Sequence, residues 1–290
     1  MSMGKLSGKT AVVTGGASGV GFAICQRFGR EGMNIVVADI EQAALDRAVG
    51  QLESEGVRAK GVVTDVTDEQ SVRNLCEQAY DTFSQVDMLF NNAGVGVKEA
   101  DRKIWELTAN DWSWGYSVNV MGIANGVRAF VPKMLEVGKP CHIINTTSFN
   151  GACISFPTTP IYASSKAAVT SLTEVLYAQL AKVAPDIKVH LLFPGPHMVN
   201  TQILASQRNR QEKFKDDNKV EDYLTMEDLK KSALGANAEF KLTEPEEVAE
   251  SCYEGVMAGQ FWIRPYLEEH QAMISGRTES VLKNENPAVM

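Results

Sequence analysis

A tyrosine and a lysine in the second half of the chain have the residue types and the spacing for proton transfer. Tyr162 is the first and Lys166 the last residue of the run Tyr-Ala-Ser-Ser-Lys. Because they are four positions apart, a helix would place both side chains on one face. A free tyrosine has a pKa of about 10 and is a poor base at neutral pH. A nearby cation lowers that pKa, so the phenol could take a proton from an alcohol or return one to a carbonyl. A solvated helix pair without chemistry is the alternative interpretation.

A glycine-rich turn near the N-terminus could bind a pyrophosphate. Residues 10–13 are of strand-forming type, Gly15, Gly19 and Gly21 follow, and a helical pattern begins near Val20. Glycine lets the backbone approach a ligand closely, and the helix N-terminus offers unpaired N–H groups with a partial positive charge. A turn that binds nothing is the alternative. The chain has no Gly-Lys-Ser/Thr continuation here, which argues against a nucleoside-triphosphatase loop.

An aspartate after the second predicted strand bears on cofactor choice. Asp39 follows the strand at residues 34–38 and lies 18 positions beyond Gly21. A carboxylate there can accept hydrogen bonds from the adenosine ribose hydroxyls and would repel a 2′-phosphate. Neither the glycine turn nor Ile40 supplies a cation for such a phosphate, so we expect NAD rather than NADP. A helix-capping aspartate is the alternative, and a cap would not exclude the ribose contact.

Strand and helix patterns alternate along the chain. After the first strand, apolar runs predict strands at residues 34–38, 60–64, 87–90, 141–147, 188–193 and 261–263. Helical spacing predicts helices at residues 42–55, around 72–83, at 112–137, 161–184 and 244–257, and near the C-terminus. Pro132 should lie at a turn or kink. Thr243 is the expected N-cap of the helix at 244–257, with Glu246 three residues later.

This alternation predicts an α/β fold with a doubly wound, Rossmann-like parallel sheet covered on both faces. No linker, composition break or internal repeat divides the chain, so we expect a single domain over residues 1–290. Between about residues 198 and 242 the chain becomes polar, which predicts a helical lid insertion. In a doubly wound sheet, ligands bind beyond the carboxyl ends of the strands, where the residues named above all fall.

The composition narrows the function classes. Hydrophobic residues make up 44% of the 290 and charged residues 22%, as in ordinary globular proteins. A net charge of -8 without a basic cluster argues against a nucleic-acid partner. The five cysteines and four histidines show no metal-ligand spacing, so we expect reduced thiols and no metal. There is no apolar run of membrane-spanning length and no signal-peptide core, so we expect a cytoplasmic protein without a membrane partner.

Together these motifs resemble the short-chain dehydrogenase/reductase family over roughly residues 6–200. Thr-Gly-x-x-x-Gly-x-Gly from Thr14 is similar to the family's cofactor loop, Asp65-Val66 to its adenine contact, and Asn-Asn-Ala-Gly at residues 91–94 to its signature after the fourth strand. The resemblance implies a single-domain, NAD(P)-dependent oxidoreductase. The cofactor contacts that it implies are Gly15, Ser18, Gly19, Val20, Gly21, Asp39, Asp65, Val66, Asn92, Ala93, Gly94, Tyr162, Lys166, Pro194 and Gly195.

The same resemblance assigns further catalytic residues. Ser148 precedes Tyr162 by 14 residues and Gly151 follows it, which matches the family serine whose hydroxyl steadies the substrate oxygen. Asn119, in Ser-Val-Asn-Val, matches the asparagine that supports a proton-relay water near the lysine; a buried structural asparagine is the alternative. The implied catalytic set is therefore Asn119, Ser148, Tyr162 and Lys166.

One loop departs from the family pattern. The family continues Pro-Gly-x-Val-x-Thr, whereas here Val199 and Thr201 arrive two residues late. No nicotinamide contact is therefore assigned to these two residues. Arg208 and Arg210, farther along the predicted lid, are interpreted as solvated side chains.

The residues expected beside the open face of the nicotinamide are mostly apolar: Val95, Val97, Phe149, Phe156, His197 and Met198. They suit a bulky apolar or aromatic secondary alcohol or ketone better than a sugar, which would need many polar partners. Residues 194–210, 130–134 and 263–270 resemble the bacterial Cα-dehydrogenases of lignin-derived aryl ethers, which oxidise a benzylic alcohol to a ketone with NAD.

Two alternatives stay open. One is an NADPH-dependent carbonyl or 3-oxoacyl/steroid reductase. The other is a non-catalytic, NAD-sensing binding protein, which loss of Ser148, Tyr162 or Lys166 would have favoured, and none is missing. The family usually forms tetramers through its two long helices, here residues 112–137 and 161–184, so we expect a homo-oligomer, a dimer or a tetramer.

Overall fold

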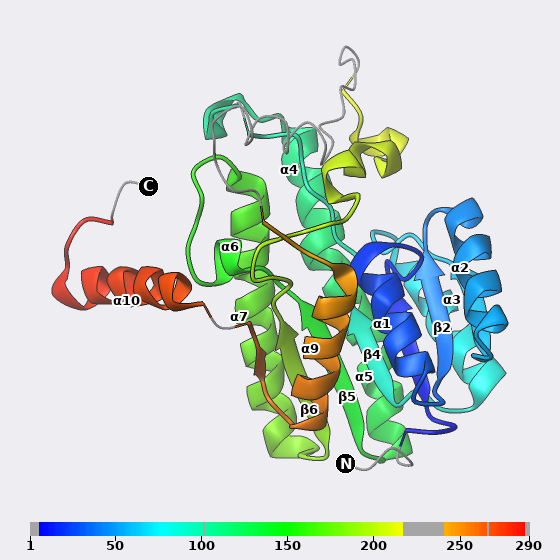
Figure 1. The fold of residues 1–290 in the computed structure, drawn as a ribbon. Helices are drawn as coiled ribbons and strands as arrows, with labels where there is room; N and C mark the ends of the chain where they lie inside the picture. The colour runs from blue at the N-terminus through cyan, green and yellow to red at the C-terminus, as the bar shows by residue number, and fades with distance from the viewer. Residues whose placement is uncertain (1–5, 101, 217–240, 266, 288–290) are drawn as a thin grey trace.

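Seven parallel strands form the central sheet, in the order β3-β2-β1-β4-β5-β6-β9 (Figure 1). The structure, a computed structural model, describes residues 6–100, 102–216, 241–265 and 267–287. The chain runs outward from β1 to β3 and then returns to β4 on the other side of β1, which confirms the predicted doubly wound fold. The strands are β1 (Thr10–Thr14), β2 (Asn34–Asp39), β3 (Ala59–Val63), β4 (Met88–Asn91), β5 (Cys141–Thr146), β6 (Ile187–Leu192) and β9 (Trp262–Ile263).

The central strands are buried on both faces, which explains why they are continuous apolar runs. β1 is buried along its whole length, and β2 is buried up to its last residue, Asp39. Val12 packs into one side of the sheet and Val13 into the other, because successive side chains of a strand point to opposite faces. Each predicted strand boundary lies within one residue of the observed one.

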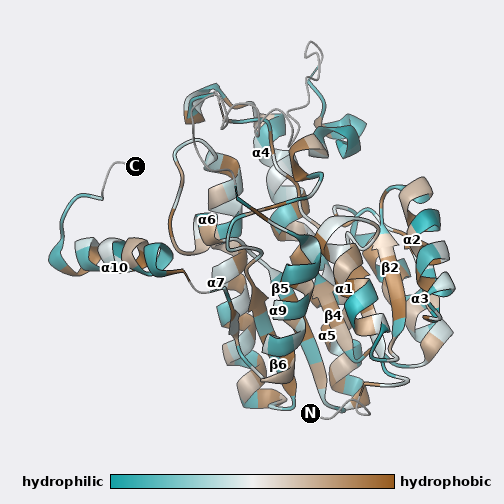
Figure 2. Ribbon diagram, viewed as in Figure 1, coloured by the Kyte–Doolittle hydropathy of each residue, from teal (hydrophilic) through white to brown (hydrophobic). Residues whose placement is uncertain are grey.

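Two helical layers cover the sheet. Buried side chains of α1, α2 and α9 pack on one face, and those of α3, α5 and α7 pack on the other. The outer helix surfaces are mainly hydrophilic, whereas the strands are mainly hydrophobic (Figure 2). The helices are α1 (Gly19–Gly29), α2 (Gln42–Ser54), α3 (Glu69–Phe83), α5 (Gly122–Val137), α7 (Pro160–Val183) and α9 (Pro245–Met257).

The long helix predicted at residues 112–137 is longer and interrupted. It consists of α4 (Ala109–Tyr116), one π-helical turn called η3 (Ser117–Met121), and α5. Pro132 does not lie at a turn, because α5 continues through it to Val137; a kink there stays a prediction. The proline removes a hydrogen bond, but Phe130 and Met134 on the same helix are fully buried in the core and hold that stretch in place.

The predicted cap of α9 is displaced by one residue. Glu244, not Thr243, is the N-cap: its N–H donates to Oε1 of Glu247 over 2.9 Å, and Pro245 occupies the first turn. Thr243 instead belongs to the short strand β8 (Leu242–Thr243), which pairs with β7 (Met198–Val199). Its buried hydroxyl accepts the N–H of His197. Thr243 therefore stabilises the loop after β6 and the strand pair, and does not cap α9.

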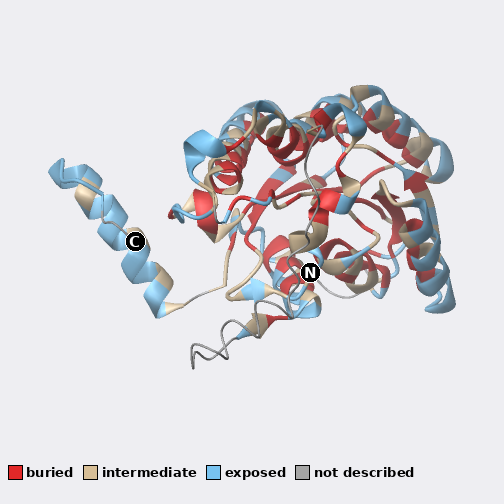
Figure 3. Ribbon diagram, turned by 90° about the horizontal axis from the view of Figure 1, so that it is seen from above, coloured by how far each residue is buried: buried red, intermediate tan, exposed pale blue. Residues whose placement is uncertain are grey.

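The polar stretch after β6 is less helical than predicted. Residues 198–216 contain β7 and two short 3-10 helices, η4 (Ile203–Asn209) and η5 (Glu212–Phe214); residues 217–240 of the predicted lid lie outside the described part. The last helix, α10 (Glu268–Lys283), projects from the body and buries none of its described residues (Figure 3). No helix in the described part of the chain is long and apolar enough to cross a membrane.

Candidate active site

A cavity of about 730 Å³ opens at the carboxyl ends of the strands. Its walls come from the glycine turn after β1, the loops after β2 to β6, and residues 194–211. Of the predicted catalytic residues, Asn119 does not line it, and of the predicted cofactor contacts Gly195 does not. The predicted cofactor and catalytic residues that do line it are Gly15, Ser18, Gly19, Val20, Gly21, Asp39, Asp65, Val66, Asn92, Ala93, Gly94, Ser148, Tyr162, Lys166 and Pro194.

The glycine turn packs so closely that two of its residues have no room for a side chain. Gly15 has a φ of +62°, and a Cβ there would lie 2.9 Å from the Cα of Ala93. A Cβ on Gly21 would overlap the carbonyl oxygen of Gly15. Ser18, the N-cap of α1, makes no side-chain capping bond, and no acidic residue stands in the helix's first turn. This end of α1 therefore offers backbone N–H groups to an anion.

Asp39 stands at the end of β2 with both carboxylate oxygens bonded to backbone. Oδ2 accepts the N–H of Ala17 and Oδ1 accepts the N–H of Glu41, each over 3.1 Å. Burial raises the pKa of this carboxyl, and the backbone donors oppose the rise. The two bonds hold the carboxylate at the rim of the cavity beside the glycine turn, where a ribose hydroxyl can reach its remaining lone pairs.

Thr14 joins the glycine turn to the loop after β4, a role that the motif alone does not reveal. Its hydroxyl donates to the carbonyl of Phe90 over 3.2 Å and accepts the N–H groups of Asn92 and Ala93 over 3.0 and 3.1 Å. The side-chain amide of Asn92 donates back to the carbonyl of Thr14 over 3.2 Å. The two cofactor loops are thus one hydrogen-bonded unit.

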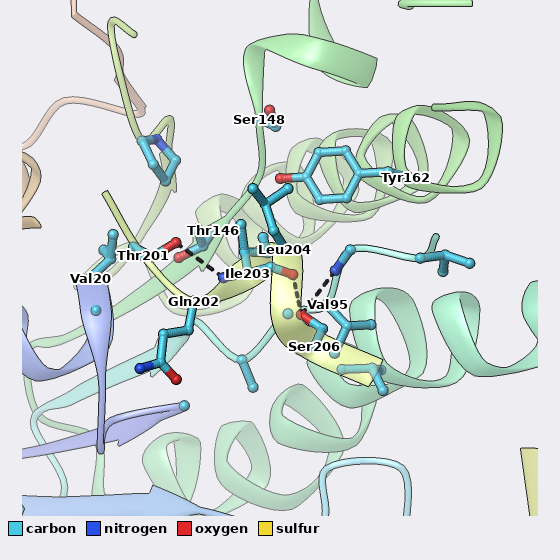
Figure 4. Close-up of a pocket in the computed structure, with 18 of the residues that line it drawn as sticks. Val20, Val95, Thr146, Ser148, Tyr162, Thr201, Gln202, Ile203, Leu204 and Ser206 are labelled. Atoms are coloured by element: carbon cyan, nitrogen blue, oxygen red, sulfur yellow. Dashed lines mark hydrogen bonds between the residues drawn. The ribbon is translucent and has the colours of Figure 1, made fainter. Parts of the chain in front are cut away.

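Ser148, Tyr162 and Lys166 line the same part of the cavity. Figure 4 shows the Tyr162 ring extending into it, with its hydroxyl on the side where Ser148 lies. Ser148 precedes the short helix α6 (Phe149–Ala152), and the other two residues come from the first turns of α7. The ammonium of Lys166 lies 5.7 Å from the centre of the Tyr162 ring and donates to the carbonyl of Thr146 over 3.0 Å.

Burial governs the ionisation of Tyr162 and Lys166 in the protein alone. It raises the pKa of Tyr162, and the Ser148 hydroxyl acts in the opposite direction. It lowers the pKa of Lys166 to about 8. The expected lowering of the tyrosine pKa by its lysine neighbour is therefore outweighed, because a dry environment disfavours both charged forms and the ammonium donates to a carbonyl.

Asn119 lies in the π-helical turn η3 and is fully buried. Its side-chain amide donates to the carbonyl of Val95 over 3.1 Å and to the hydroxyl of Ser165 over 3.0 Å. Its side-chain oxygen accepts the N–H of Val95 over 2.8 Å. The side chain therefore joins the loop after β4 to α7, and a part in proton relay stays a prediction.

The predicted substrate residues surround one end of the cavity, and one further aromatic group joins them. His270, at the start of α10, lines the cavity and stacks on Phe149 with ring centres 4.0 Å apart and planes 19° apart. Nothing local in the sequence connects His270 with a residue more than a hundred positions earlier. The predicted residues that line the cavity are Val95, Val97, Phe149, Phe156, His197 and Met198.

Val199 and Thr201 both line the cavity, despite their late position in the loop. A Cβ on Gly19 would lie 2.9 Å from the Cγ2 of Thr201, so this loop rests against the glycine turn. Farther along, the hydroxyl of Ser206 accepts the N–H of Gly96 over 3.3 Å (Figure 4).

Of the two arginines of this segment, Arg208 is exposed, as the sequence suggested, but forms an ion pair, whereas Arg210 is buried and not solvated. Arg208 lies 2.8 Å from a carboxylate oxygen of Glu41, two residues beyond Asp39. Arg210 is buried and lies 2.8 Å from a carboxylate oxygen of Asp111 on α4. Gln211 donates to Asp65 over 3.0 Å. Their partners lie far away in the sequence, so the residue pattern could not show these contacts.

Comparison with known proteins settles the family. The family described as short chain dehydrogenase matches residues 9–212. The chain belongs to this family. A short-chain dehydrogenase is an oxidoreductase, and the resemblance predicted from the motifs is confirmed.

The relatives of this short-chain dehydrogenase cover nearly its whole length. A Cα-dehydrogenase of Sphingobium sp. is 32% identical over 91% of this chain and 83% of its own. A short-chain dehydrogenase/reductase from Burkholderia phymatum, solved in complex with NAD, is 36% identical with a TM-score of 0.87, covering 99% of this chain and 98% of its own. LigO from Sphingobium sp., solved in the apo form, is 30% identical with a TM-score of 0.76, covering 98% and 90%.

The cavity of this short-chain dehydrogenase fits a dinucleotide on its own geometry. The glycine turn exposes backbone N–H groups, without side chains in the way, where a pyrophosphate would lie. Asp39, at the end of the neighbouring strand β2, lines the same cavity. Within the described residues, no group of three or more His, Cys, Asp or Glu side chains could hold a metal ion.

Proposed function

We propose that this protein transfers a hydride between NAD(H) and a bulky apolar or aromatic secondary alcohol or its ketone, with Tyr162 as general acid and base. One observation supports this most: Ser148, Tyr162 and Lys166 line the same cavity as the glycine turn and an apolar wall. A pyrophosphate-binding turn, a proton donor and an apolar substrate wall are the parts that such an oxidoreductase needs.

NAD would be held by the glycine turn, Asp39, and the loops that begin at Asp65 and Asn92. When bound, it supplies the hydride acceptor or donor. The carboxylate of Asp39 supports NAD over NADP by repelling a 2′-phosphate. Arg208 and Arg47 are cations near this rim, and the charge of Arg208 is offset by its pairing with Glu41.

The chain's own residues would move the proton. In the oxidative direction, Tyr162 as phenolate accepts the alcohol proton, and in the reductive direction its phenol returns that proton to the carbonyl oxygen. The Ser148 hydroxyl would donate to the substrate oxygen and hold it beside the phenol. The Lys166 ammonium, anchored on the Thr146 carbonyl behind the ring, stabilises the phenolate electrostatically.

The aromatic wall supports an aryl substrate. Phe149 follows the proposed serine directly and is backed by the stacked ring of His270. A flat aromatic group gains contact with such a face, whereas a sugar would leave its hydroxyls without partners. The relatives from Sphingobium, a Cα-dehydrogenase and LigO, support a benzylic alcohol beside an aryl ether as the substrate class.

The test is NAD reduction with a panel of alcohols by the purified protein. We expect turnover of α-(phenoxymethyl)benzyl alcohol and α-methylbenzyl alcohol, weaker turnover with NADP, and none with sugars. Tight NAD binding without turnover of any alcohol or ketone would instead favour an NAD-sensing protein. Turnover of ketones with NADPH alone would favour the reductase alternative.

We also propose that residues 198–242 act as a lid and that the protein is a cytoplasmic homo-oligomer. Thr201 and Ser206 reach across to the cofactor loops, which supports the lid. Val175, Tyr177 and Val183 are exposed apolar side chains on α7, which supports an oligomer interface on that helix. All five cysteines are free, as in a reducing compartment. A monomer in light scattering would refute the oligomer.

A further inference from the structure

Glu99 is a buried carboxylate that contacts the catalytic helix. It lies in the loop after β4 and is 2% exposed. Its Oε2 accepts the N–H of Ile161 over 2.7 Å, and its Oε1 accepts the N–H of Tyr162 itself over 3.0 Å. Each carboxylate oxygen therefore holds one backbone donor in the first turn of α7.

The first turn of α7 depends on this carboxylate, because its own cap is occupied elsewhere. Pro160 has no N–H, and the N-cap Thr159 makes no side-chain capping bond. The Thr159 hydroxyl instead accepts the side-chain amide of Asn150 over 2.7 Å, while its carbonyl accepts the N–H of Ala163. Glu99 is thus the acceptor for the two remaining donors of this turn, and its negative charge suits the positive end of the helix.

We propose that Glu99 is a positioning residue for Tyr162, which fixes the turn that carries the phenol relative to the loop that carries the cofactor contacts. Glu99 lies in the same loop as Ala93 and Gly94. Val95, which lies between Gly94 and Glu99, is hydrogen-bonded through its backbone to the side chain of Asn119. The inference rests on the proposed function, because it concerns the same phenol. A small displacement of a reacting group lowers turnover strongly while leaving binding intact.

Burial and the charges around Glu99 decide the direction of its pKa shift. Arg102 and Asp111 face it, and Asp111 is itself paired with Arg102 and Arg210. Burial is the largest influence and raises the pKa of Glu99, with Asp111 adding to the rise; the two backbone donors and Arg102 oppose it. Acid therefore protonates Glu99 at a higher pH than an exposed glutamate, and a protonated carboxyl holds the two N–H groups less well. The kcat should fall on the acid side through this protonation.

Three variants test the proposal with NAD and α-(phenoxymethyl)benzyl alcohol as probes. Glu99→Ala should lower kcat on the order of 100-fold, with the Kd for NAD by calorimetry unchanged. Glu99→Gln should lower kcat less and remove the Glu99 step from the acid side of the kcat profile, because it does not titrate, while the step from protonation of Tyr162 remains. Glu99→Asp should recover part of the turnover and retain the Glu99 step. Amide hydrogen exchange in the first turn of α7 should be faster in Glu99→Ala.

Asp87→Asn is the matched control, because Asp87 is also a buried carboxylate that accepts a backbone N–H, from Thr10 over 2.9 Å, at the far end of the sheet. It should lower stability but leave kcat and the exchange of α7 unchanged. Wild-type kcat in Glu99→Ala and Glu99→Gln, or equal losses in the Glu99 and Asp87 variants, would overturn the proposal. Absence of turnover in the wild type would refute the proposed function instead, and the exchange measurement would still decide on Glu99.

Discussion

Lys166 is buried and Tyr162 is half-buried in the cavity wall, and removal from solvent favours the neutral form of each. A positive charge brought into the cavity acts on both, favouring the phenolate and disfavouring the ammonium. In the proposed mechanism the oxidised nicotinamide would bring such a charge, so the phenol would be a better base with NAD bound than in the protein alone. Tyr162 would then be activated only in the NAD complex.

A second single residue, Asp39, is expected to decide between NAD and NADP. We predict that Asp39→Ala will narrow the preference for NAD over NADP by at least about tenfold in kcat/KM, since it removes the repulsion of a 2′-phosphate. The measurement is kcat/KM for both cofactors with one alcohol. Asp68→Ala, which removes the side-chain N-cap of α3, is the control and should leave the ratio unchanged. An unaltered ratio in Asp39→Ala would exclude Asp39 from cofactor selection.

At the scale of elements, residues 198–216 join four separate parts of the site. Thr201 rests on the glycine turn, Arg208 pairs with Glu41 at the start of α2, and Gln211 donates to Asp65 after β3. Arg210 pairs with Asp111 on α4. Because these contacts lie around the cofactor end of the cavity, opening of this segment and release of NAD should be coupled.

Arg208→Gln tests that coupling. Arg208 and Glu41 are both partly exposed, so we predict a modest effect, about a twofold to fivefold rise in the KM for NAD, with kcat retained. Added salt should raise the wild-type KM toward that of the variant. Lys283→Gln removes an exposed ion pair on α10 and is the control. A KM for NAD that matches the wild type at low salt would show that the Glu41 contact does not hold the segment.

At the scale of the whole molecule, two histidines link strands β5 and β6: His142 is half-buried and His190 is fully buried. His142 Nδ1 lies 2.9 Å from His190 Nε2, and His190 Nδ1 lies 2.6 Å from the carbonyl of Gln260. The carbonyl requires a proton on His190 Nδ1, so Nε2 accepts from His142 and both rings are neutral. Burial lowers the pKa of both, that of His142 to about 3.

This pair predicts how stability depends on pH. The unfolded chain binds the protons near pH 6.5, whereas the folded protein binds them only at lower pH, so stability is complete above 6.5 and falls below it. Each histidine contributes up to about 1.4 kcal/mol per pH unit. Urea unfolding between pH 8 and about 4 measures the slope, which His142→Asn should make shallower. Equal stability across this interval would contradict the assignment of neutral rings.

The sheet could be predicted from the sequence because burial on both faces leaves a continuous apolar run in strands such as Asn34–Asp39. The cofactor turn and the Tyr162–Lys166 pair were also predictable, since their spacing is local. Glu99 and His270 were not, because each acts through a partner far away in the sequence. Thr243 was misassigned for the same reason: its strand partner, Val199, lies more than forty residues earlier.

The most direct test of the central claim compares wild type with Tyr162→Phe, a change that removes only the phenol oxygen. Single-turnover NAD reduction with α-(phenoxymethyl)benzyl alcohol gives the rate, and calorimetry gives the Kd for NAD. We predict a rate at least about 1,000-fold lower with an unchanged Kd. A Tyr162→Phe protein that reduces NAD at the wild-type rate would contradict the account.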